Sequence, residues 1–138
     1  MKKVYLIVLS IFTLLSCSTK KASSTNQKQT ENSLNKSWAL THMNNEKVDF
    51  KTSLIITNSR FNGKAVCNNY NGTVANYTNT NISFKTIIAT RMACPKLSEE
   101  QAYFQLLETV THYKESNNIL ALLDENNKTV LVFTSTNL

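Results

Sequence analysis

The chain has 138 residues, enough for one domain of ordinary size, and a formal net charge of +6. Five of the fifteen basic residues precede residue 32, where Glu31 is the only acid, and the rest of the chain carries ten basic residues against eight acidic ones. A nucleic-acid-binding protein concentrates its positive charge on the folded domain, so this distribution argues against a nucleic-acid partner.

Residues 1–16 have the pattern of a secretory signal peptide. Two lysines follow Met1, and residues 4–15 form an apolar run that is shorter than the roughly 20 residues of a membrane-spanning helix. The sequence Leu-Leu-Ser-Cys at 14–17 resembles the lipobox of bacterial lipoproteins, although its second Leu is larger than the usual small residue. The resemblance implies cleavage before Cys17, which would carry diacylglyceryl and N-acyl chains such as palmitate. The alternative is an ordinary signal peptide with an incidental cysteine.

Residues 17–35 are predicted to form the lipidated cysteine and a flexible tether, and residues 36–138 one folded domain. The tether consists of Ser, Thr, Asn, Gln and Lys with almost no apolar content, so it cannot bury enough surface to offset its ordering entropy. Ser18 replaces the Asp that is associated with retention in the inner membrane. The predicted location is therefore the outer membrane, with the domain facing the periplasm.

Cys67 and Cys94 remain once Cys17 is assigned to lipid. A cysteine pair in the oxidising envelope most often forms a disulfide, which here would close a loop of about 28 residues and contribute about 3.5 kcal/mol. Two reduced, buried thiols are an alternative. A metal site is a poor fit, because the cysteines lack CxxC spacing and only His42 and His112 could join them.

The domain is predicted to be rich in short strands. Alternating and β-branched patterns predict strands near residues 38–40, 53–57, 64–67, 73–77, 82–88, 119–123 and 129–134. Residues 60–63 are expected to interrupt this series, and Asn117-Asn118 to form a turn. Asn71-Gly72 is the strongest turn signal, since both central positions of a type I′ hairpin turn take positive φ.

One helix is predicted after Pro95. Ser98 is the expected N-cap, with Gln101 completing a capping box, and Glu99 and Glu100 suit the positive end of the helix dipole. The apolar stripe expected to face the core consists of Tyr103, Leu106, Leu107 and Val110. Several strands, one helix and a final hairpin predict an α+β fold, in which one helix packs on a small, partly barrel-like antiparallel sheet.

Two motifs resemble the signatures of the META domain family, which includes the HslJ-like heat-inducible lipoproteins. The sequence Cys-Asn-Asn-Tyr-Asn-Gly at 67–72 is similar to the family pattern Gly-Cys-Asn-x-(Phe/Tyr)-x-Gly, and Thr-Arg-Met-Ala-Cys-Pro at 90–95 is similar to Thr-x-Met-Ala-Cys-Pro. The resemblance spans about Trp38 to Phe133. One residue departs from the pattern: Val66 stands where the family has Gly, which matters if that position needs positive φ.

The resemblance implies a small β-rich fold with one helix, an envelope location, and links to stress tolerance such as heat and novobiocin sensitivity. It implies no defined catalytic activity. Its motif residues are expected to have structural or binding roles: Asn68, Tyr70, Gly72, Arg91, Met92 and Pro95.

The sequence offers little for catalysis. His42 is expected in a polar loop, and His112 at a helix end, where a histidine is favoured whatever the function. The two glycines of the chain are too few for a phosphate-binding loop. We therefore predict neither an enzyme nor a bound metal or cofactor.

Two functions remain open for a domain that we expect to be monomeric. The first is binding of another envelope protein, which predicts an exposed apolar or aromatic patch. The alternative is a small-ligand-binding module with a pocket between the sheet and the helix. A hydrolase would require a pocket where His42 or His112 meets a Ser or Thr hydroxyl.

Overall fold

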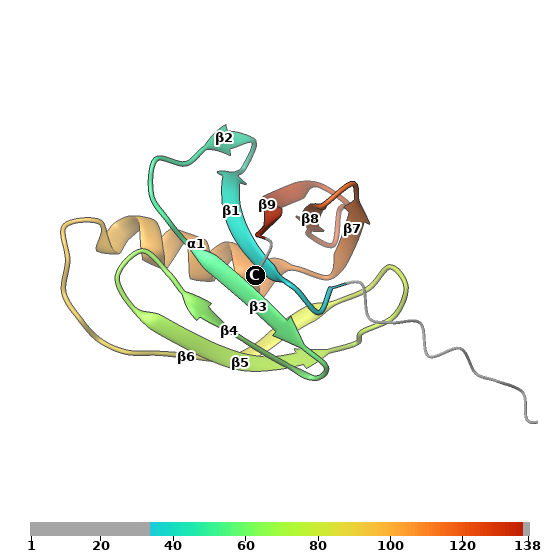
Figure 1. Ribbon diagram of the computed structural model, residues 1–138, viewed down its shortest axis with the longest axis horizontal. Helices are drawn as coiled ribbons and strands as arrows, with labels where there is room; N and C mark the ends of the chain where they lie inside the picture. Colours follow the sequence, from blue (N-terminus) through green and yellow to red (C-terminus); the bar gives the residue numbers. More distant parts are fainter. Residues whose placement is uncertain (1–33, 137–138) are drawn as a thin grey trace, which may run out of the picture.

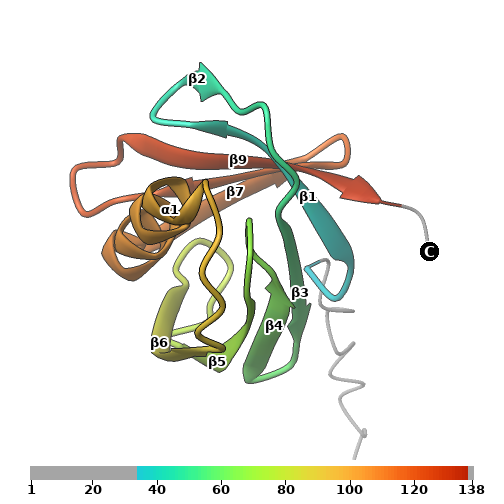
Figure 2. The ribbon, with the colours of Figure 1, turned by 90° about the vertical axis from the view of Figure 1, so that its left-hand side faces the viewer.

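The computed structural model describes residues 34–136, which form a nine-stranded antiparallel sheet with a helix packed on it (Figures 1 and 2). The elements are β1 (Ser37–Met43), β2 (Glu46–Lys47), β3 (Ser53–Thr57), β4 (Arg60–Lys64), β5 (Asn69–Ala75), β6 (Ser83–Ala89), α1 (Leu97–Thr109), β7 (His112–Ser116), β8 (Ile119–Leu123) and β9 (Thr129–Thr136). The strand order is β6-β5-β4-β3-β1-β9-β8-β7, and β2 pairs with the end of β1. The predicted α+β architecture is confirmed.

The sheet curls until its outer strands, β6 and β7, meet at one corner. An isolated antiparallel bridge joins Asn81 to His112, and the Ile82 N–H donates to the Thr111 carbonyl at 3.1 Å. Away from this corner the two strands separate, and α1 lies over the opening (Figure 2). The sheet is therefore an open, partly barrel-like structure in which the helix covers the gap.

Apolar side chains from both the sheet and the helix fill the interior. Trp38, Leu54 and Phe133 of the sheet are fully buried, as are Tyr103 and Leu107 of α1. Burial of one large apolar side chain stabilises a fold by roughly 1.5–3 kcal/mol, so this shared core is what holds the helix over the opening.

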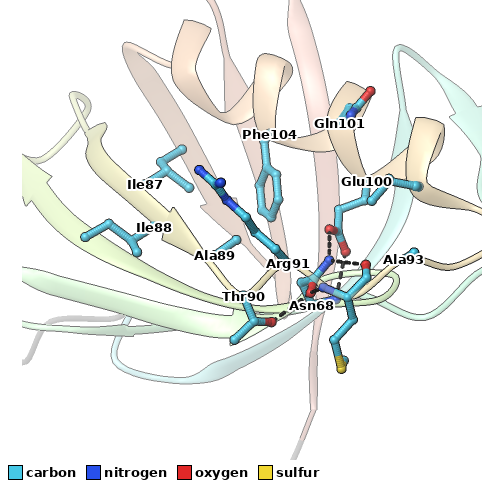
Figure 3. A pocket seen from close by; sticks show the side chains of 12 residues that line it. Asn68, Ile87, Ile88, Ala89, Thr90, Arg91, Ala93, Glu100, Gln101 and Phe104 are labelled. Atoms are coloured by element: carbon cyan, nitrogen blue, oxygen red, sulfur yellow. Dashed lines mark hydrogen bonds between the residues drawn. The ribbon is translucent and has the colours of Figure 1, made fainter.

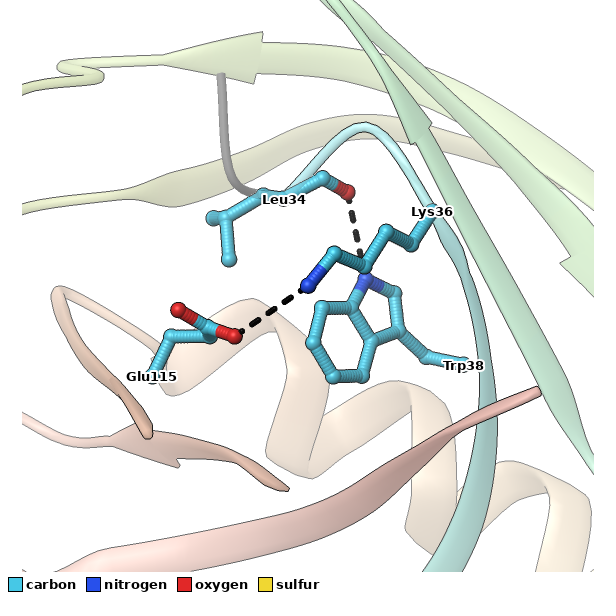
Figure 4. A network of polar contacts seen from close by, with 4 residues as sticks. All are labelled: Leu34, Lys36, Trp38 and Glu115. Atoms are coloured by element: carbon cyan, nitrogen blue, oxygen red, sulfur yellow. Dashed lines mark hydrogen bonds and ion pairs between the residues drawn. The ribbon is translucent and has the colours of Figure 1, made fainter. Parts of the chain in front are cut away.

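Leu34 packs the residues that precede β1 against the rest of the domain (Figure 4). Its side chain is fully buried, and its carbonyl accepts a hydrogen bond from Trp38 Nε1 at 3.1 Å. Lys36 lies 5.5 Å from the centre of the Trp38 ring and pairs with Glu115 of β7 at 3.4 Å. The ion pair is partly exposed and contributes at most about 1 kcal/mol, so the buried Leu34 and Trp38 dominate this contact.

The predicted turn at Asn71-Gly72 is wrong, because both residues lie inside β5. Gly72 faces the ring of Phe61, which a Cβ at that position would overlap, and the same Cβ would lie 2.6 Å from the Lys85 carbonyl oxygen. The glycine is needed for close packing and not for positive φ. Two-residue turns with positive φ at both positions occur instead at Asn44-Asn45 and at the predicted Asn117-Asn118.

Three further expectations about elements are wrong. Residues 60–63 do not interrupt the sheet but belong to β4, and His112 begins β7, a strand that the sequence patterns missed. The capping box is absent from α1: the helix begins at Leu97, its N-cap Lys96 makes no side-chain capping bond, and the Ser98 hydroxyl donates to Glu99. Within residues 34–136, α1 is too short and polar to cross a bilayer.

Candidate functional site: a groove between β6 and α1

Glu100, in the first turn of α1, is a buried carboxylate held by three N–H donors (Figure 3). The backbone N–H groups of Cys67 and Asn68 donate to Oε2 at 2.7 and 2.8 Å, and the Asn68 side-chain amide donates to Oε1 at 2.6 Å. Hydrogen bonds to a charged group contribute about 1.5–3 kcal/mol each. The start of α1 is thereby tied to the loop between β4 and β5.

The Asn68 side chain also holds the segment that follows β6. Its Oδ1 accepts from the Thr90 hydroxyl and from the Met92 N–H, both at 2.7 Å, and its amide group donates to the Met92 carbonyl at 3.2 Å. A disulfide between Cys67 and Cys94, with the Cα atoms 6.2 Å apart, joins the same two segments covalently. Asn68 and the disulfide together fix the course of residues 90–94.

Tyr70 and Tyr103 form a buried pair beneath this region. Their hydroxyl oxygens lie 2.6 Å apart, and the Tyr70 hydroxyl donates to the Ser53 carbonyl at 2.8 Å, which leaves Tyr103 as the donor within the pair. Burial raises the pKa of both phenols well above the usual value, and a hydrogen bond from Tyr103 opposes part of the rise at Tyr70. The pair is a neutral, hydrogen-bonded link between β5 and α1.

A surface groove of about 670 Å³ lies above these links, between β6 and α1 (Figure 3). Its walls are residues 87–89 of β6, residues 90–93 and one face of α1 around Phe104. Ile88 and Met92 are 59% and 55% exposed at its rim. Arg91 extends over the groove toward Phe104 and makes no hydrogen bond or ion pair with any described residue. The groove is thus mainly apolar, with one unpaired cation.

The family model of the META domain matches residues 31–137 of this chain. The chain belongs to the META domain family. No curated protein sequence matches it.

Solved structures share this META fold at low sequence identity. An NMR structure of a protein from Burkholderia xenovorans is 24% identical, with a TM-score of 0.59 over 75% of this chain and 83% of that one. A second NMR structure is 20% identical, with a TM-score of 0.57 over 74% of this chain and 90% of that one. A DUF4847 family protein from Bacteroides vulgatus ATCC 8482 is 19% identical, with a TM-score of 0.50 over 62% and 59%. These likenesses are of fold alone.

The structure places the META motif residues in two groups. Asn68, Tyr70 and Gly72 point inward and hold β5 and its loops in place, whereas Arg91 and Met92 lie at the groove. Pro95 is exposed in the turn before α1. Val66, which replaces the family glycine, is not among the residues with positive φ, so the substitution strains no backbone.

Glu100 is the site residue that sequence reasoning missed. The helix dipole gives a sufficient reason for Glu at this position, and so its burial under the loop at Cys67 was not foreseen. The available signal was its position six residues after Cys94, since a disulfide to Cys67 would bring the first turn of a helix close to that loop. Cys17 lies outside the described residues.

The two histidines lie on strands, apart from the groove walls. His42 is in β1 and not in a polar loop, and its Nδ1 lies 3.0 Å from the Thr41 hydroxyl oxygen. His112 Nδ1 lies 2.8 Å from the Thr111 hydroxyl oxygen and 3.4 Å from the Asp124 carbonyl oxygen. Within residues 34–136 no three His, Cys, Asp or Glu side chains are arranged to hold a metal ion.

Proposed function

We propose that this META domain protein is a non-enzymatic lipoprotein of the bacterial envelope that binds another envelope protein through the groove between β6 and α1. The observation that carries the proposal is the pair of large apolar side chains, Ile88 and Met92, left 59% and 55% exposed at the rim of one apolar groove. Single exposed apolar residues are ordinary on a protein surface, but a contiguous set around a groove is typical of a binding site.

The packing of the domain supports a protein partner over a small ligand. The interior between the sheet and α1 is filled by buried side chains, so the available space is the groove at the surface. Small-ligand sites combine an apolar lining with several convergent polar groups. Here Glu100 and Thr90 are both bonded to Asn68, which leaves Arg91 and Gln101 as the polar side chains at the groove with no hydrogen bond or ion pair in residues 34–136.

The histidine geometry supports a role without catalysis. A Ser-His-Asp arrangement uses both ring nitrogens, one toward the nucleophile and one toward the orienting acceptor. His112 makes both of its contacts, to the Thr111 hydroxyl and the Asp124 carbonyl, through Nδ1. Its partner hydroxyl is also the adjacent residue in the chain, a local contact that side chains of this kind often make.

The membrane part of the proposal rests on the sequence. The signal pattern and the Leu-Leu-Ser-Cys sequence at 14–17 support a lipid anchor on Cys17, and Ser18 supports the outer membrane. Cys17→Ser is expected to move the protein from the membrane fraction to the soluble periplasm. Density-gradient fractions would show the unaltered protein with the outer membrane. Recovery of Cys17→Ser in the membrane would contradict the anchor.

Site-specific photo-crosslinking in living cells tests the binding role. A photoreactive residue at Ile88 or Met92 is expected to give one defined adduct, identified by mass spectrometry as the same envelope protein from both positions. Ile119 of β8, 48% exposed and away from the groove, is the matched control and should give no such adduct. The proposal is wrong if neither groove position gives an adduct, or if Ile119 gives the same one.

We also propose that binding through the groove supports stress tolerance, as the META resemblance implies. Cells that lack the protein should be more sensitive to heat and to novobiocin, and a copy with Ile88→Asp should fail to restore tolerance. Restoration by that copy, at wild-type protein levels, would separate the groove from the stress role.

A further inference from the structure

The geometry points to the form of the partner: an extended acidic peptide strand that adds to the free edge of β6 at Ile87–Ala89, with a carboxylate meeting Arg91. This inference rests on the proposed function, because it names what occupies the groove. Addition of a strand to an exposed sheet edge supplies main-chain hydrogen bonds, while the groove beside that edge receives the side chains.

The hydrogen bonds of β5 show which groups of β6 face outward. The Thr90 N–H donates to the Asn69 carbonyl at 3.0 Å, so the backbone N–H of Thr90 faces β5. Along a strand, the backbone N–H and C=O groups of successive residues face opposite neighbouring strands. The groups of Ile88 therefore face β5, like the Thr90 N–H, and the groups of Ile87 and Ala89 face away from it. β6 ends the strand order, and within residues 34–136 no strand pairs with this side of it beyond the Asn81 bridge.

The other outer strand, β7, does not offer an equivalent edge. The Tyr113 N–H donates to the Thr80 carbonyl at 2.9 Å, and the Tyr113 hydroxyl donates to the Thr78 carbonyl at 3.0 Å. The loop before β6 therefore covers the start of β7. Of the two outer strands in residues 34–136, β6 is the one whose edge lies beside the groove, at Ile87–Ala89.

A bulge separates this edge from the first half of β6. The pairing shifts between Asn71 and Thr73, and opposite Gly72 the strand contains Thr86 with φ of 53°. Bulges bend a strand and re-aim its side chains, often beside functional sites. Beyond the bulge, Ile87 and Ala89 are half-buried and Ile88 is exposed, and all three residues line the groove.

Charge favours an acidic partner over a second copy of this chain. Residues 83–92 contain Lys85 and Arg91 and no acid. Antiparallel pairing of two copies that sets Ile87 opposite Ala89 also sets Lys85 opposite Arg91 on both sides, which is repulsive. The lysines at 20, 21 and 28 of the predicted tether carry the same sign. An acidic strand instead neutralises Arg91, which has no ion pair within residues 34–136.

The test uses the full chain and capped synthetic peptides of about seven residues, a typical strand length, with alternating Val and Thr and one Glu moved along the series. The best peptide is expected to slow amide hydrogen exchange at Ile87 and Ala89, measured by NMR, while exchange at Ile119 stays unchanged. Arg91→Glu should weaken its binding about tenfold, and the matching peptide with Lys in place of Glu should recover binding to that variant.

Two independent changes test the main-chain pairing. The same peptide N-methylated at alternate residues cannot donate to the edge and should lose binding to the unaltered protein. Ala89→Pro removes an outward N–H without removing a bond to β5, and should also lose binding.

The outcomes separate this inference from the proposed function. Equal binding of the N-methylated peptide would overturn strand addition, and equal binding of the Lys peptide to the unaltered protein would overturn the acidic partner, even if Ile88 still crosslinks a partner in cells. A groove-dependent dimer in sedimentation would overturn the acidic partner in favour of a second copy. Loss of crosslinking at Ile88 and Met92 would remove the proposed function itself.

Discussion

At the scale of single residues, the hydrogen bond between Asn68 and Glu100 can be tested by exchanging the amide and the carboxylate between the two positions. Asn68→Asp places a carboxylate oxygen where the amide now donates to Glu100 at 2.6 Å, and should cost about 3 kcal/mol of the free energy of unfolding. Glu100→Gln alone should also destabilise. In the double variant, the new carboxylate at position 68 still accepts from Thr90 and Met92. The new amide at position 100 donates to that carboxylate and accepts from the loop.

Urea unfolding of the four proteins in this cycle measures the coupling. The double variant is expected to recover about 2 kcal/mol relative to the sum of the single changes. Strict additivity would show that the two side chains do not interact in the way that their hydrogen bonds indicate.

Tyr70 and Tyr103 predict a loss of stability at alkaline pH. Burial raises the pKa of both phenols in the folded protein above the value of about 10 expected in the unfolded chain. Stability is therefore complete below about pH 10 and falls above it, because the unfolded chain releases protons that the folded protein retains. Tyr103→Phe should reduce the slope of unfolding free energy against pH by up to about 1.4 kcal/mol per pH unit.

The measurement is urea unfolding of both proteins at a series of alkaline pH values. Tyrosinate absorbance should show ionisation of the buried pair only as the protein unfolds. Identical slopes for the two proteins would mean that Tyr103 ionises in the folded state.

Part of the site could be predicted from the two sequence motifs. The two motifs contain Asn68, Arg91 and Met92, and the structure places buried Asn68 at the base of one groove and exposed Arg91 and Met92 along it. Glu100 and the inward role of Gly72 were not foreseen, because each had a sufficient local explanation, a helix dipole in one case and a turn in the other. Only the long-range contacts of the folded chain distinguish these explanations from the actual roles.

At the scale of elements, asparagine shapes the turns. In the part of the chain that the structure describes, the non-glycine residues with positive φ are Thr86 and seven asparagines: Asn44, Asn45, Asn58, Asn76, Asn117, Asn118 and Asn127. Asn tolerates this conformation better than other residues with a Cβ, since its side chain bonds locally. Part of the high Asn content is therefore structural.

The Asn117-Asn118 turn between β7 and β8 supports a matched pair of substitutions. Asn118 has φ of 63°, so Asn118→Ala should destabilise the domain by about 1 kcal/mol, whereas Asn118→Gly should stabilise it by roughly 0.5 kcal/mol. Asn126→Ala, at an exposed Asn without positive φ, is the control and should change little. Thermal or urea unfolding of the three variants measures the order. Equal effects of Ala and Gly at 118 would contradict backbone strain as the cause.

The sequence patterns predict the elements in which two or more buried apolar residues recur at the period of a strand or a helix. β1, β3, β8, β9 and the stripe of α1 fit that description, whereas β4 and β7 carry mostly polar residues around Phe61 and Tyr113. Polar strands of this kind form because neighbouring strands supply the hydrogen bonds, which a local pattern does not contain.

At the scale of the whole molecule, the groove lies far from the N-terminal entry. Figure 1 shows the blue start of the described chain and the segment between β6 and α1 toward opposite ends of the long axis. With the proposed anchor on Cys17, the groove would be held away from the point where the tether joins the domain. That placement suits a site for a partner that approaches from the periplasm.

The disulfide and the Asn68–Glu100 bonds hold this end of the molecule together, and their contributions can be separated. Replacing Cys67 and Cys94 by Ser should cost about 3 kcal/mol, since the disulfide joins residues 27 positions apart and restricts the unfolded chain. The domain should still fold, because the shared core of sheet and helix and the Glu100 bonds remain. Native hydrogen exchange should rise most in residues 90–96 and the first turn of α1, while β8 and β9 change only with the global stability. Unfolding of the unaltered protein in the presence of reductant should give the same loss. An unchanged urea midpoint in both cases would show that the hydrogen bonds alone fix residues 90–96, and that the groove keeps its shape without the disulfide.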